Sequence, residues 1–371
     1  MLKDFGGRVA ALSLSVAILG AFAFAGPASA QVKTGKMGVI VQLTGSSATY
    51  GIGVQNAVKI AQQELKEKGI IDLEINYEDH QQQPQLAVQG FQKLVDAYGV
   101  KVVLANASPI VLALSPFAKE RGVLVYNYNA VSPALRSLPP WIVNGNPLAD
   151  VDGKVLAQFI MRQGKTTVGV ISQNSEFGEA VSAAFKKSYQ EAGGKIVAHE
   201  VSDERVFDMR TQLLKIKAAQ PQALVIFLNI PENGYTVAQA REIGLNAEIY
   251  SNQFLLSPDN YKVAGDAMNG VQGVSPKFDL EAPNAKAFVE KFKAIAGRAP
   301  QPSEGFSYDG TRIIGEAMAA AGNDPQAIRK HILAVKDWPG VVGNYNFDSD
   351  GVAQLPFEYY KIENQKPTFH N

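Results

Sequence analysis

The chain of 371 residues contains no cysteine, which excludes disulfide bonds, thiol chemistry and attachment to a membrane through a lipidated cysteine. It also has no excess of either charge, because 35 basic side chains balance 35 acidic ones and both signs are interspersed. A nucleic-acid-binding protein normally concentrates basic residues in a patch or stripe. We therefore expect no nucleic-acid partner.

The motifs of common enzyme classes are absent as well. The four histidines are far apart, and none has the spacing of a zinc motif such as H-E-x-x-H. "GKT" at Gly164–Thr166 lacks the earlier glycine of a phosphate-binding loop, and no G-x-S-x-G stretch marks a nucleophilic serine. We expect no metal, no cofactor and no catalytic residues, with an exported α/β enzyme as the last alternative.

Long apolar runs are missing after the N-terminus. There, "MLKDFGGR" precedes the apolar run Val9–Phe24, and small residues lead to Ala30. This three-part layout predicts a cleaved secretory signal peptide over residues 1–30 and an exported protein. The alternative is an uncleaved anchor, but the run is shorter than the about 20 residues that a membrane-spanning helix needs. The remaining chain is long enough for two domains of usual size.

What the chain does contain is a regular alternation of short apolar runs and amphipathic segments. "KMGVIVQL", "DLEINYED" and "KVVLA" are typical of strands, while the segments between them have helical spacing and end at glycine. A second set of the same kind follows "WIVNGNPLADVD". Strands separated by such helices predict parallel sheets built from right-handed βαβ units. The expected fold class is α/β, with two doubly wound lobes that have parallel central sheets.

We expect the chain to cross between the lobes three times, near residues 144–150, 274–277 and 344–346. Three crossings form a hinge, which suits closure around a ligand. In such sheets ligands bind beyond the carboxyl ends of the strands, so the loops that follow the strands are the candidate site. The predicted lobes are lobe 1, residues 31–147 plus 276–344, and lobe 2, residues 148–275 plus 345–371.

The turn "NASP" joins a predicted strand to a predicted helix. Ser108 precedes Pro109, which is favoured at the first position of a helix, so the simplest interpretation is that Ser108 caps the helix. The alternative is that its hydroxyl and the nearby N–H groups bind a carboxylate. "YNYNAVSP" repeats the arrangement at Ser132, and "QLTGSSATYG" places small hydroxyl residues before Tyr50. Three such turns on one sheet edge favour a binding role.

From about Lys36 to Tyr360 the sequence resembles periplasmic substrate-binding proteins of branched-chain amino-acid-type ABC transporters. The resemblance depends on the order and spacing of "VQLTGSSATYG", "ANASPIVLALSPFAKERGV", "NAVSPAL", "SQNSEFGEAVSAAFKKSYQEAGGKIV" and "SYDGTRIIGEAM". It implies a two-lobed clamshell that binds a small molecule and, as a monomer, delivers it to membrane permease subunits. A ligand sensor built on the same fold is the alternative.

The resemblance also implies which residues contact the ligand. In the family, the turn at Ala107 and Ser108 binds the ligand carboxylate. The turn at Ala130 and Ser132 holds the ammonium through a carbonyl and the carboxylate through a hydroxyl and an N–H group. With aromatic walls and polar loop residues added, the expected ligand-binding residues are Tyr50, Asn106, Ala107, Ser108, Ala130, Ser132, Phe177, Asn229 and Gln253.

One position departs from the family pattern. Amino-acid binders carry an acidic residue that pairs with the ligand ammonium, and Gln253 stands at that position here. An amide brings no charge, and a buried ammonium without a counter-ion is costly. With Tyr50, Phe177 and Phe254 nearby, we expect an aromatic or phenylpropanoid acid as the ligand. The alternatives are a short aliphatic acid, a small amide, and a branched-chain or other hydrophobic amino acid.

Overall fold

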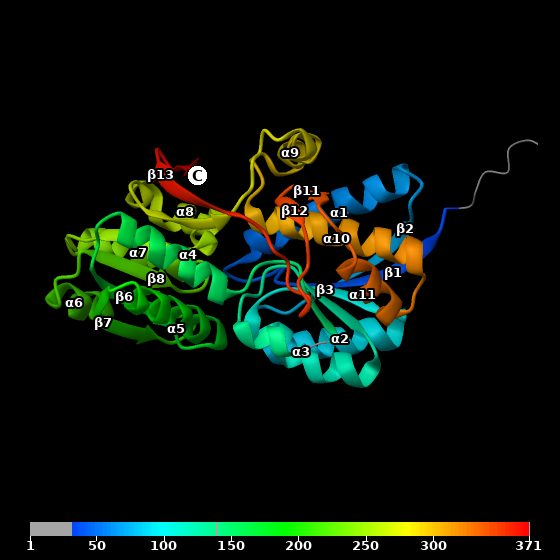
Figure 1. Cartoon of the computed structure of the whole chain (residues 1–371), viewed down its shortest axis with the longest axis horizontal. Helices are drawn as coiled ribbons and strands as arrows, with labels where there is room; N and C mark the ends of the chain where they lie inside the picture. Colours follow the sequence, from blue (N-terminus) through cyan, green and yellow to red (C-terminus); the bar gives the residue numbers. More distant parts are fainter. Residues whose placement is uncertain (1–31, 139, 371) are drawn as a thin grey trace, which may run out of the picture. The chain divides into compact units, whose positions relative to one another are not determined.

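The computed structural model describes residues 32–138 and 140–370, so the predicted signal peptide lies outside the described residues. Two α/β lobes, each with its own sheet, make up this part of the chain (Figure 1). None of the helices described here is long and apolar enough to cross a membrane.

The first lobe is formed by a five-stranded parallel sheet and the helices on its two faces. Its elements are β1 (Thr34–Val41), α1 (Ala48–Glu67), β2 (Asp72–Asp79), α2 (Pro84–Tyr98), β3 (Val102–Ala105), α3 (Ser108–Arg121), β4 (Leu124–Asn127), η1 (Pro133–Ser137), β5 (Ile142–Asn144), α9 (Pro283–Ala296), α10 (Pro302–Ala321), α11 (Pro325–Leu333), β11 (Trp338–Gly340) and β12 (Gly343–Tyr345). One apolar core joins the sheet to α2 and α3, and another joins it to α1, α9 and α10. Burial on both faces explains why the strands are continuous apolar runs.

The second lobe contains a seven-stranded sheet with the order β14-β13-β10-β9-β8-β6-β7. Its elements are α4 (Ala149–Arg162), β6 (Thr167–Gln173), α5 (Glu176–Glu191), β7 (Lys195–Ser202), α6 (Arg210–Ala218), β8 (Ala223–Phe227), α7 (Glu232–Glu242), β9 (Glu248–Ser251), η2 (Gln253–Leu256), α8 (Pro258–Ala264), η3 (Gly265–Met268), β10 (Gln272–Pro276), β13 (Phe357–Glu363) and β14 (Lys366–His370). The strands from β7 to β10 are parallel, whereas β13 and β14 are added in antiparallel orientation. The α/β class with parallel central sheets is therefore confirmed, and the C-terminal hairpin is an addition to it.

The chain passes between the lobes after β5, after β10 and before β13. The third passage lies later than the sequence predicted, because Phe347, Val352 and Leu355 are buried in the cores of the first lobe. A turn closed by the bond from Gly351 N to Asp348 O (3.0 Å) brings Val352 beside β5. The boundary near residues 344–346 was therefore wrong, and the crossing lies near Pro356.

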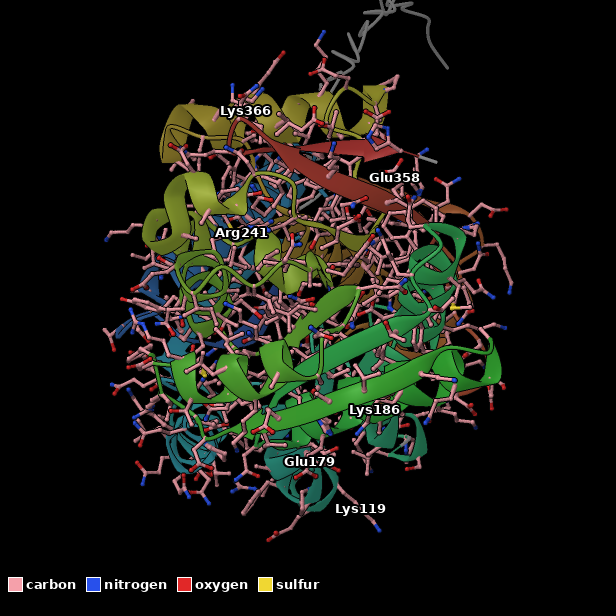
Figure 2. The ribbon with its side chains drawn as sticks, turned by 90° about the vertical axis from the view of Figure 1, so that its left-hand side faces the viewer. Lys119, Glu179, Lys186, Arg241, Glu358 and Lys366 are labelled. Atoms are coloured by element: carbon pink, nitrogen blue, oxygen red, sulfur yellow. The ribbon has the colours of Figure 1, made fainter. Side chains whose placement is uncertain are left out.

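The surface of the second lobe carries both signs of charge. Figure 2 shows Glu179 and Lys186 on α5, Arg241 on α7 and Lys366 on β14. Acidic and basic side chains thus share this face, as expected from the balanced composition.

Both sheets have a point where the strand order reverses. It lies between β1 and β3 in the first lobe and between β6 and β8 in the second. Loops that leave such neighbouring strands pass to opposite faces of the sheet, which opens a crevice at the carboxyl ends. A ligand site is therefore expected at the loops before α1, α3, α5 and α7.

Candidate ligand-binding site

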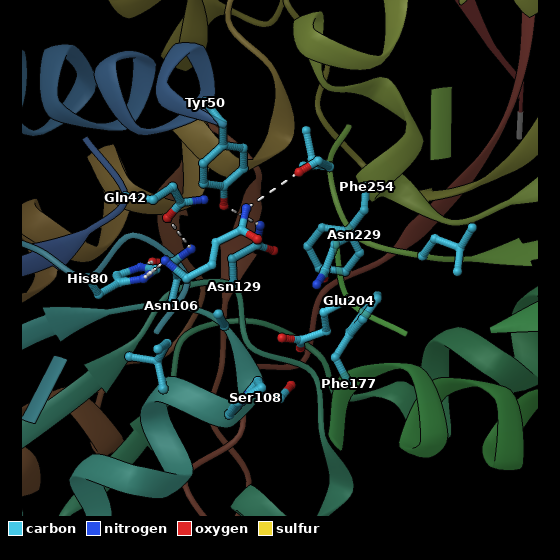
Figure 3. A pocket seen from close by; sticks show the side chains of 16 residues that line it. Gln42, Tyr50, His80, Asn106, Ser108, Asn129, Phe177, Glu204, Asn229 and Phe254 are labelled. Carbon is cyan, nitrogen blue, oxygen red and sulfur yellow. Dashed lines mark hydrogen bonds between the residues drawn. The ribbon is translucent and has the colours of Figure 1, made fainter. Parts of the chain in front are cut away.

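A cavity with an empty volume of about 670 Å³ lies at these loops, with residues of both lobes around it (Figure 3). The lining residues are Gln42, Tyr50, His80, Gln82, Asn106, Ala107, Ser108, Pro109, Ile110, Asn129, Phe177, Glu204, Leu228, Asn229, Ile230 and Phe254. Among the predicted site residues, Tyr50, Asn106, Ala107, Ser108, Phe177 and Asn229 are in this set.

The hydroxyl of Ser108 has a defined hydrogen-bonding role. It accepts hydrogen bonds from the backbone N–H groups of Val131 (3.2 Å) and Ser132 (3.1 Å) in the loop after β4. A hydroxyl oxygen has two lone pairs and one proton, so this group can still only donate. An acceptor is therefore the expected partner of Ser108 in the cavity.

The prediction that Ser108 caps α3 was wrong. The cap residue is Ala107, and no side-chain capping bond is made at this helix start. Ala107 has a left-handed backbone with φ of 66°, which is unusual for a residue other than glycine. Ser108 is thereby placed inside the helix, where its side chain reaches the loop of the next strand. Strained backbone of this kind is often found at ligand sites.

The N-terminus of α3 forms one end of the cavity. Ser108, Pro109 and Ile110 line the cavity in the first turn of this helix, where N–H groups have no acceptor four residues earlier. The helix dipole makes this end favourable for a negative charge. None of the lining residues is Lys or Arg, so an anion bound here is held by neutral dipoles.

A relay of polar side chains lies on the first-lobe side of the cavity (Figure 3). Gln82 N donates to His80 Nδ1 (2.9 Å), His80 Nε2 donates to Asn106 Oδ1 (3.3 Å), and Asn106 Nδ2 donates to Gln42 Oε1 (3.2 Å). Burial lowers the pKa of His80 to about 4, so the ring is neutral at physiological pH. The relay therefore fixes the orientation of Asn106 and Gln42 without adding charge.

Aromatic rings form the apolar walls. The rings of Phe177 and Phe254 meet edge to face with centroids 5.1 Å apart. On the other side, Tyr50 Oη accepts a hydrogen bond from Asn129 Nδ2 (2.9 Å), and burial raises the pKa of Tyr50 to about 12. The phenol is therefore neutral. A flat apolar group fits between such walls.

Two predicted site residues, Ala130 and Ser132, do not line the cavity. The carbonyl of Ala130 already accepts hydrogen bonds from Asn127 Nδ2 (2.7 Å) and Asn146 Nδ2 (3.0 Å). Ser132 caps η1 through Ala134 N, and its hydroxyl donates to Glu176 Oε1 across to the second lobe (2.6 Å). Both residues therefore hold loops in place within this structure.

Gln253 lines a second, smaller cavity next to the first, together with Tyr50 and Asn129. Its side-chain nitrogen donates to Asn129 Oδ1 (2.9 Å), which links it to the tyrosine wall.

Sequence reasoning missed His80 and Glu204. His80 directly follows β2 and could have been found by the same rule that selected the other loops. Glu204 follows β7, the edge strand of the second sheet, which gave no motif. Its side chain is exposed at the cavity. Partial burial of the carboxyl nevertheless raises its pKa, and the neighbouring Arg205 opposes this shift.

Direct hydrogen bonds join the two lobes beside the cavity. Ser47 Oγ donates to Ile230 O (2.6 Å), and Arg205 Nη2 donates to Gln81 O (3.1 Å). In addition, the backbone N–H of Tyr50, in the first turn of α1, donates to Asp259 Oδ2 on α8 (3.2 Å). Ser47 makes no capping bond to α1, so the second lobe supplies the carboxylate at this helix start.

Asp259→Ala is expected to weaken ligand binding about fivefold, because the lost capping contact is worth about 1 kcal/mol and is made only between the lobes. Titration calorimetry gives the affinity, and small-angle scattering gives the radius of gyration, which should increase in the variant. Asp266→Ala is the control, since Asp266 accepts from Gln365 Nε2 within the second lobe. Equal affinity and equal radius for Asp259→Ala and the wild type would contradict the expected role.

A buried carboxyl group supports the loop that carries Phe254. Asn252 Nδ2 donates to Asp152 Oδ2 (3.2 Å), while Asn252 Oδ1 accepts from Phe254 N (3.2 Å). Asp152 is 5% exposed and its other oxygen has no partner among the described residues. Burial raises the pKa of Asp152 to about 7, although the bond from Asn252 opposes this shift.

This raised pKa predicts a pH dependence of stability. Between about pH 4 and pH 7 the native state holds a proton on Asp152 that the unfolded state has lost. The free energy of unfolding should therefore fall as the pH rises through this range, by roughly 1 kcal/mol per pH unit. Asp152→Asn should reduce this slope in urea titrations. The slope should not vanish, because burial also raises the pKa of Asp309 to about 7 and this group still contributes in the variant. Asp150→Asn, a change at an exposed position of the same helix, is the control, and an unchanged slope in Asp152→Asn would refute the assignment.

Two hinged α/β lobes that meet around a cavity with an anion-favouring end and aromatic walls define the class of solute-binding proteins. Residues 34–367 match the periplasmic binding protein family, and the chain belongs to this family. Its members are solute-binding proteins rather than enzymes.

Known relatives agree with this membership. The Leu/Ile/Val-binding protein homolog 1 of Brucella abortus (strain 2308) is 28% identical over 360 residues, which cover 94% of this chain and 95% of the relative. The crystal structure of the leucine binding protein LivK from Thermotoga maritima superposes with a TM-score of 0.85 at 22% identity, covering 91% of this chain and 98% of that one.

A solute binding protein from R. palustris in complex with benzoate has a TM-score of 0.82 at 16% identity, covering 90% of this chain and 94% of that one. At these identities the structural likeness shows the fold alone. The sequence resemblance to substrate-binding proteins of the branched-chain amino-acid transporter type is confirmed by the family match and the relatives.

Proposed function

We propose that this chain is the extracytoplasmic receptor of an ABC importer and binds a small aromatic carboxylic acid between its lobes. The hydroxyl of Ser108 carries this proposal. Its lone pairs are engaged by Val131 N and Ser132 N, so it donates, and it stands at a helix N-terminus that lines the cavity. A carboxylate oxygen is the acceptor that such an end favours.

The groups expected to hold an ammonium in amino-acid binders support the same conclusion. The resemblance assigns this role to the carbonyl of Ala130 and to an acidic side chain at position 253. Here the carbonyl is engaged by Asn127 and Asn146, and position 253 is glutamine. A ligand without an α-amino group therefore suits these positions better.

The walls of the cavity favour an aromatic body. Tyr50 lies opposite Phe177 and Phe254 across the cavity (Figure 3). Rings in such a slot bury a large apolar area and gain further from edge-to-face contacts. The benzoate complex of the R. palustris relative shows that this fold accommodates an aromatic acid.

A hydrophobic amino acid is the second candidate, favoured by Glu204. This carboxylate lines the cavity and could pair with an ammonium, and the Brucella relative is named for leucine, isoleucine and valine. Glu204→Gln separates the two candidates. It should leave the affinity for an aromatic acid unchanged or raise it, because a like charge is removed, whereas it should weaken binding of an amino acid.

We also propose that the chain is exported by its N-terminal signal peptide, acts in the periplasm as a monomer and delivers its ligand to membrane permease subunits. The family membership and the N-terminal sequence support this. Mass spectrometry of the exported protein should give a mature chain that begins at Gln31. Retention of the first thirty residues would contradict the cleavage.

A thermal-shift screen tests the ligand class. The protein is mixed with aromatic acids, branched-chain amino acids and small amides. A ligand at 100 times its dissociation constant adds about 2.7 kcal/mol, which moves the midpoint by several degrees in a chain of this size. We expect shifts with aromatic acids. Shifts with leucine, isoleucine or valine alone would refute the proposal.

A further inference from the structure

The second cavity adjoins the ligand site. It has an empty volume of about 240 Å³ and shares Tyr50, Asn129, Ile230 and Phe254 with the larger one. Its remaining lining residues are Gln253, Leu256, Ser257, Gln301, Pro302 and Ser303. None of the residues that line it carries a charge.

The amide of Gln253 has a fixed orientation and an unused oxygen. Gln253 Nε2 donates to Asn129 Oδ1 (2.9 Å), and Asn129 Nδ2 in turn donates to Tyr50 Oη (2.9 Å). The first bond holds the amide nitrogen of Gln253 toward Asn129, so the amide oxygen points away from Asn129. Gln253 is 8% exposed, and its Oε1 has no partner among the described residues. A buried acceptor in this state costs about 1–3 kcal/mol.

A second buried oxygen belongs to Ser257, which lines the same cavity. Ser257 is 5% exposed, and its hydroxyl has no hydrogen-bond partner among the described residues. The residue precedes α8, but its side chain makes no capping bond there. The residues that line the cavity thus offer one unpartnered oxygen that can only accept, on Gln253, and one unpartnered hydroxyl that can donate and accept, on Ser257. A group that satisfies both must donate to Gln253.

We propose that this cavity is a specificity subsite for a hydroxyl group at the end of the ligand remote from its carboxylate, so that the ligand is a hydroxylated aromatic acid. This inference rests on the proposed function, which places the carboxylate at Ser108. The hydroxyl donates to Gln253 Oε1 and accepts from Ser257 Oγ. An ammonium is disfavoured in the subsite, since no lining residue is acidic and a buried cation needs a counter-ion.

The shared residues explain how one ligand occupies both cavities. Tyr50, Ile230 and Phe254 line both, so an aromatic ring packed against them extends from one cavity into the other. Asn129 also lines both cavities. Its hydrogen bonds to Gln253 and Tyr50 fix the position of the subsite relative to the aromatic wall. The ring is then the spacer between the two polar ends.

Calorimetric titrations with three matched compounds test the subsite. They are 3-phenylpropanoate and its 3-hydroxyphenyl and 4-hydroxyphenyl analogues, with the wild type, Gln253→Met and Ser257→Ala. In the wild type one hydroxylated compound should bind at least tenfold tighter than 3-phenylpropanoate. Gln253→Met should remove this advantage, so that the hydroxylated compounds bind this variant no tighter than 3-phenylpropanoate does. Ser257→Ala should reduce the advantage in part, and it provides the test if Gln253→Met does not fold.

The outcomes separate this inference from the proposed function. If all three acids bind the wild type equally, the second cavity holds water rather than a ligand hydroxyl, and the inference is overturned while the proposed function stands. If the hydroxyl advantage persists in both variants, the hydroxyl is bound elsewhere and the inference is again overturned. If none of the acids binds and L-phenylalanine or L-leucine does, the proposed function fails together with the inference.

Discussion

Ser108→Ala is expected to weaken binding of an aromatic acid about 100-fold, which corresponds to about 2.7 kcal/mol. The variant removes a hydroxyl that donates to a charged acceptor, and such bonds contribute about 1.5–3 kcal/mol. It also removes the acceptor of Val131 N and Ser132 N, which positions the loop after β4. Calorimetric titration of the wild type and the variant with the same acid measures the effect.

Ser182→Ala is a matched control for this variant. Ser182 is also buried at a helix position, and its hydroxyl donates to Glu179 O (3.2 Å) away from the cavity. Its removal should leave the affinity unchanged. An affinity of Ser108→Ala within about threefold of the wild type, with the fold intact, would show that the hydroxyl does not contact the ligand.

Gly51→Ala is expected to lower the free energy of unfolding by about 3 kcal/mol. A methyl group at Gly51 would lie 1.6 Å from the carbonyl oxygen of Gln42 and 2.5 Å from its carbonyl carbon. The obstacle is backbone rather than a flexible side chain, so α1 and the end of β1 must separate. Glycine is thus required for the close approach that brings Gln42 and Tyr50 together to the first-lobe side of the cavity.

Urea denaturation, with the midpoint and slope compared, measures this loss. Ile52→Ala is the control on the same helix, because Ile52 is 48% exposed and its truncation should change stability by no more than about 0.5 kcal/mol. A Gly51→Ala variant as stable as Ile52→Ala would mean that α1 is free to move away from β1 without cost.

Local signals in the sequence were sufficient for most of the parallel core. The alternation in "DLEINYED" matches β2, and Pro84 and Gly99 mark the first helical residue and the left-handed cap of α2. The C-terminal hairpin was harder to predict from the sequence. Asn364 and Gln365 turn it with left-handed backbones, and this pair lacks the glycine that usually identifies such a turn.

The candidate site was predictable as a set of loops but not as a set of contacts. The strand-end rule placed Ser108 and Asn229 at the cavity, because it depends only on the order of the elements. The partners of Ser108 lie more than twenty residues away in the chain, so a local pattern suggested capping instead. The carbonyl of Ala130 likewise accepts a hydrogen bond from Asn146, 16 residues later in the chain, and no local pattern predicts this contact.

The comparison of 3-phenylpropanoate with L-phenylalanine by titration calorimetry tests the central claim most directly. The two compounds share the aromatic ring, the chain length and the carboxylate, and differ only in the α-ammonium group. We predict that 3-phenylpropanoate binds in the micromolar range and at least 100-fold tighter than L-phenylalanine. Tighter binding of L-phenylalanine, or of L-leucine with no binding of the acid, would contradict the claim that the site recognises a carboxylate without an ammonium beside it.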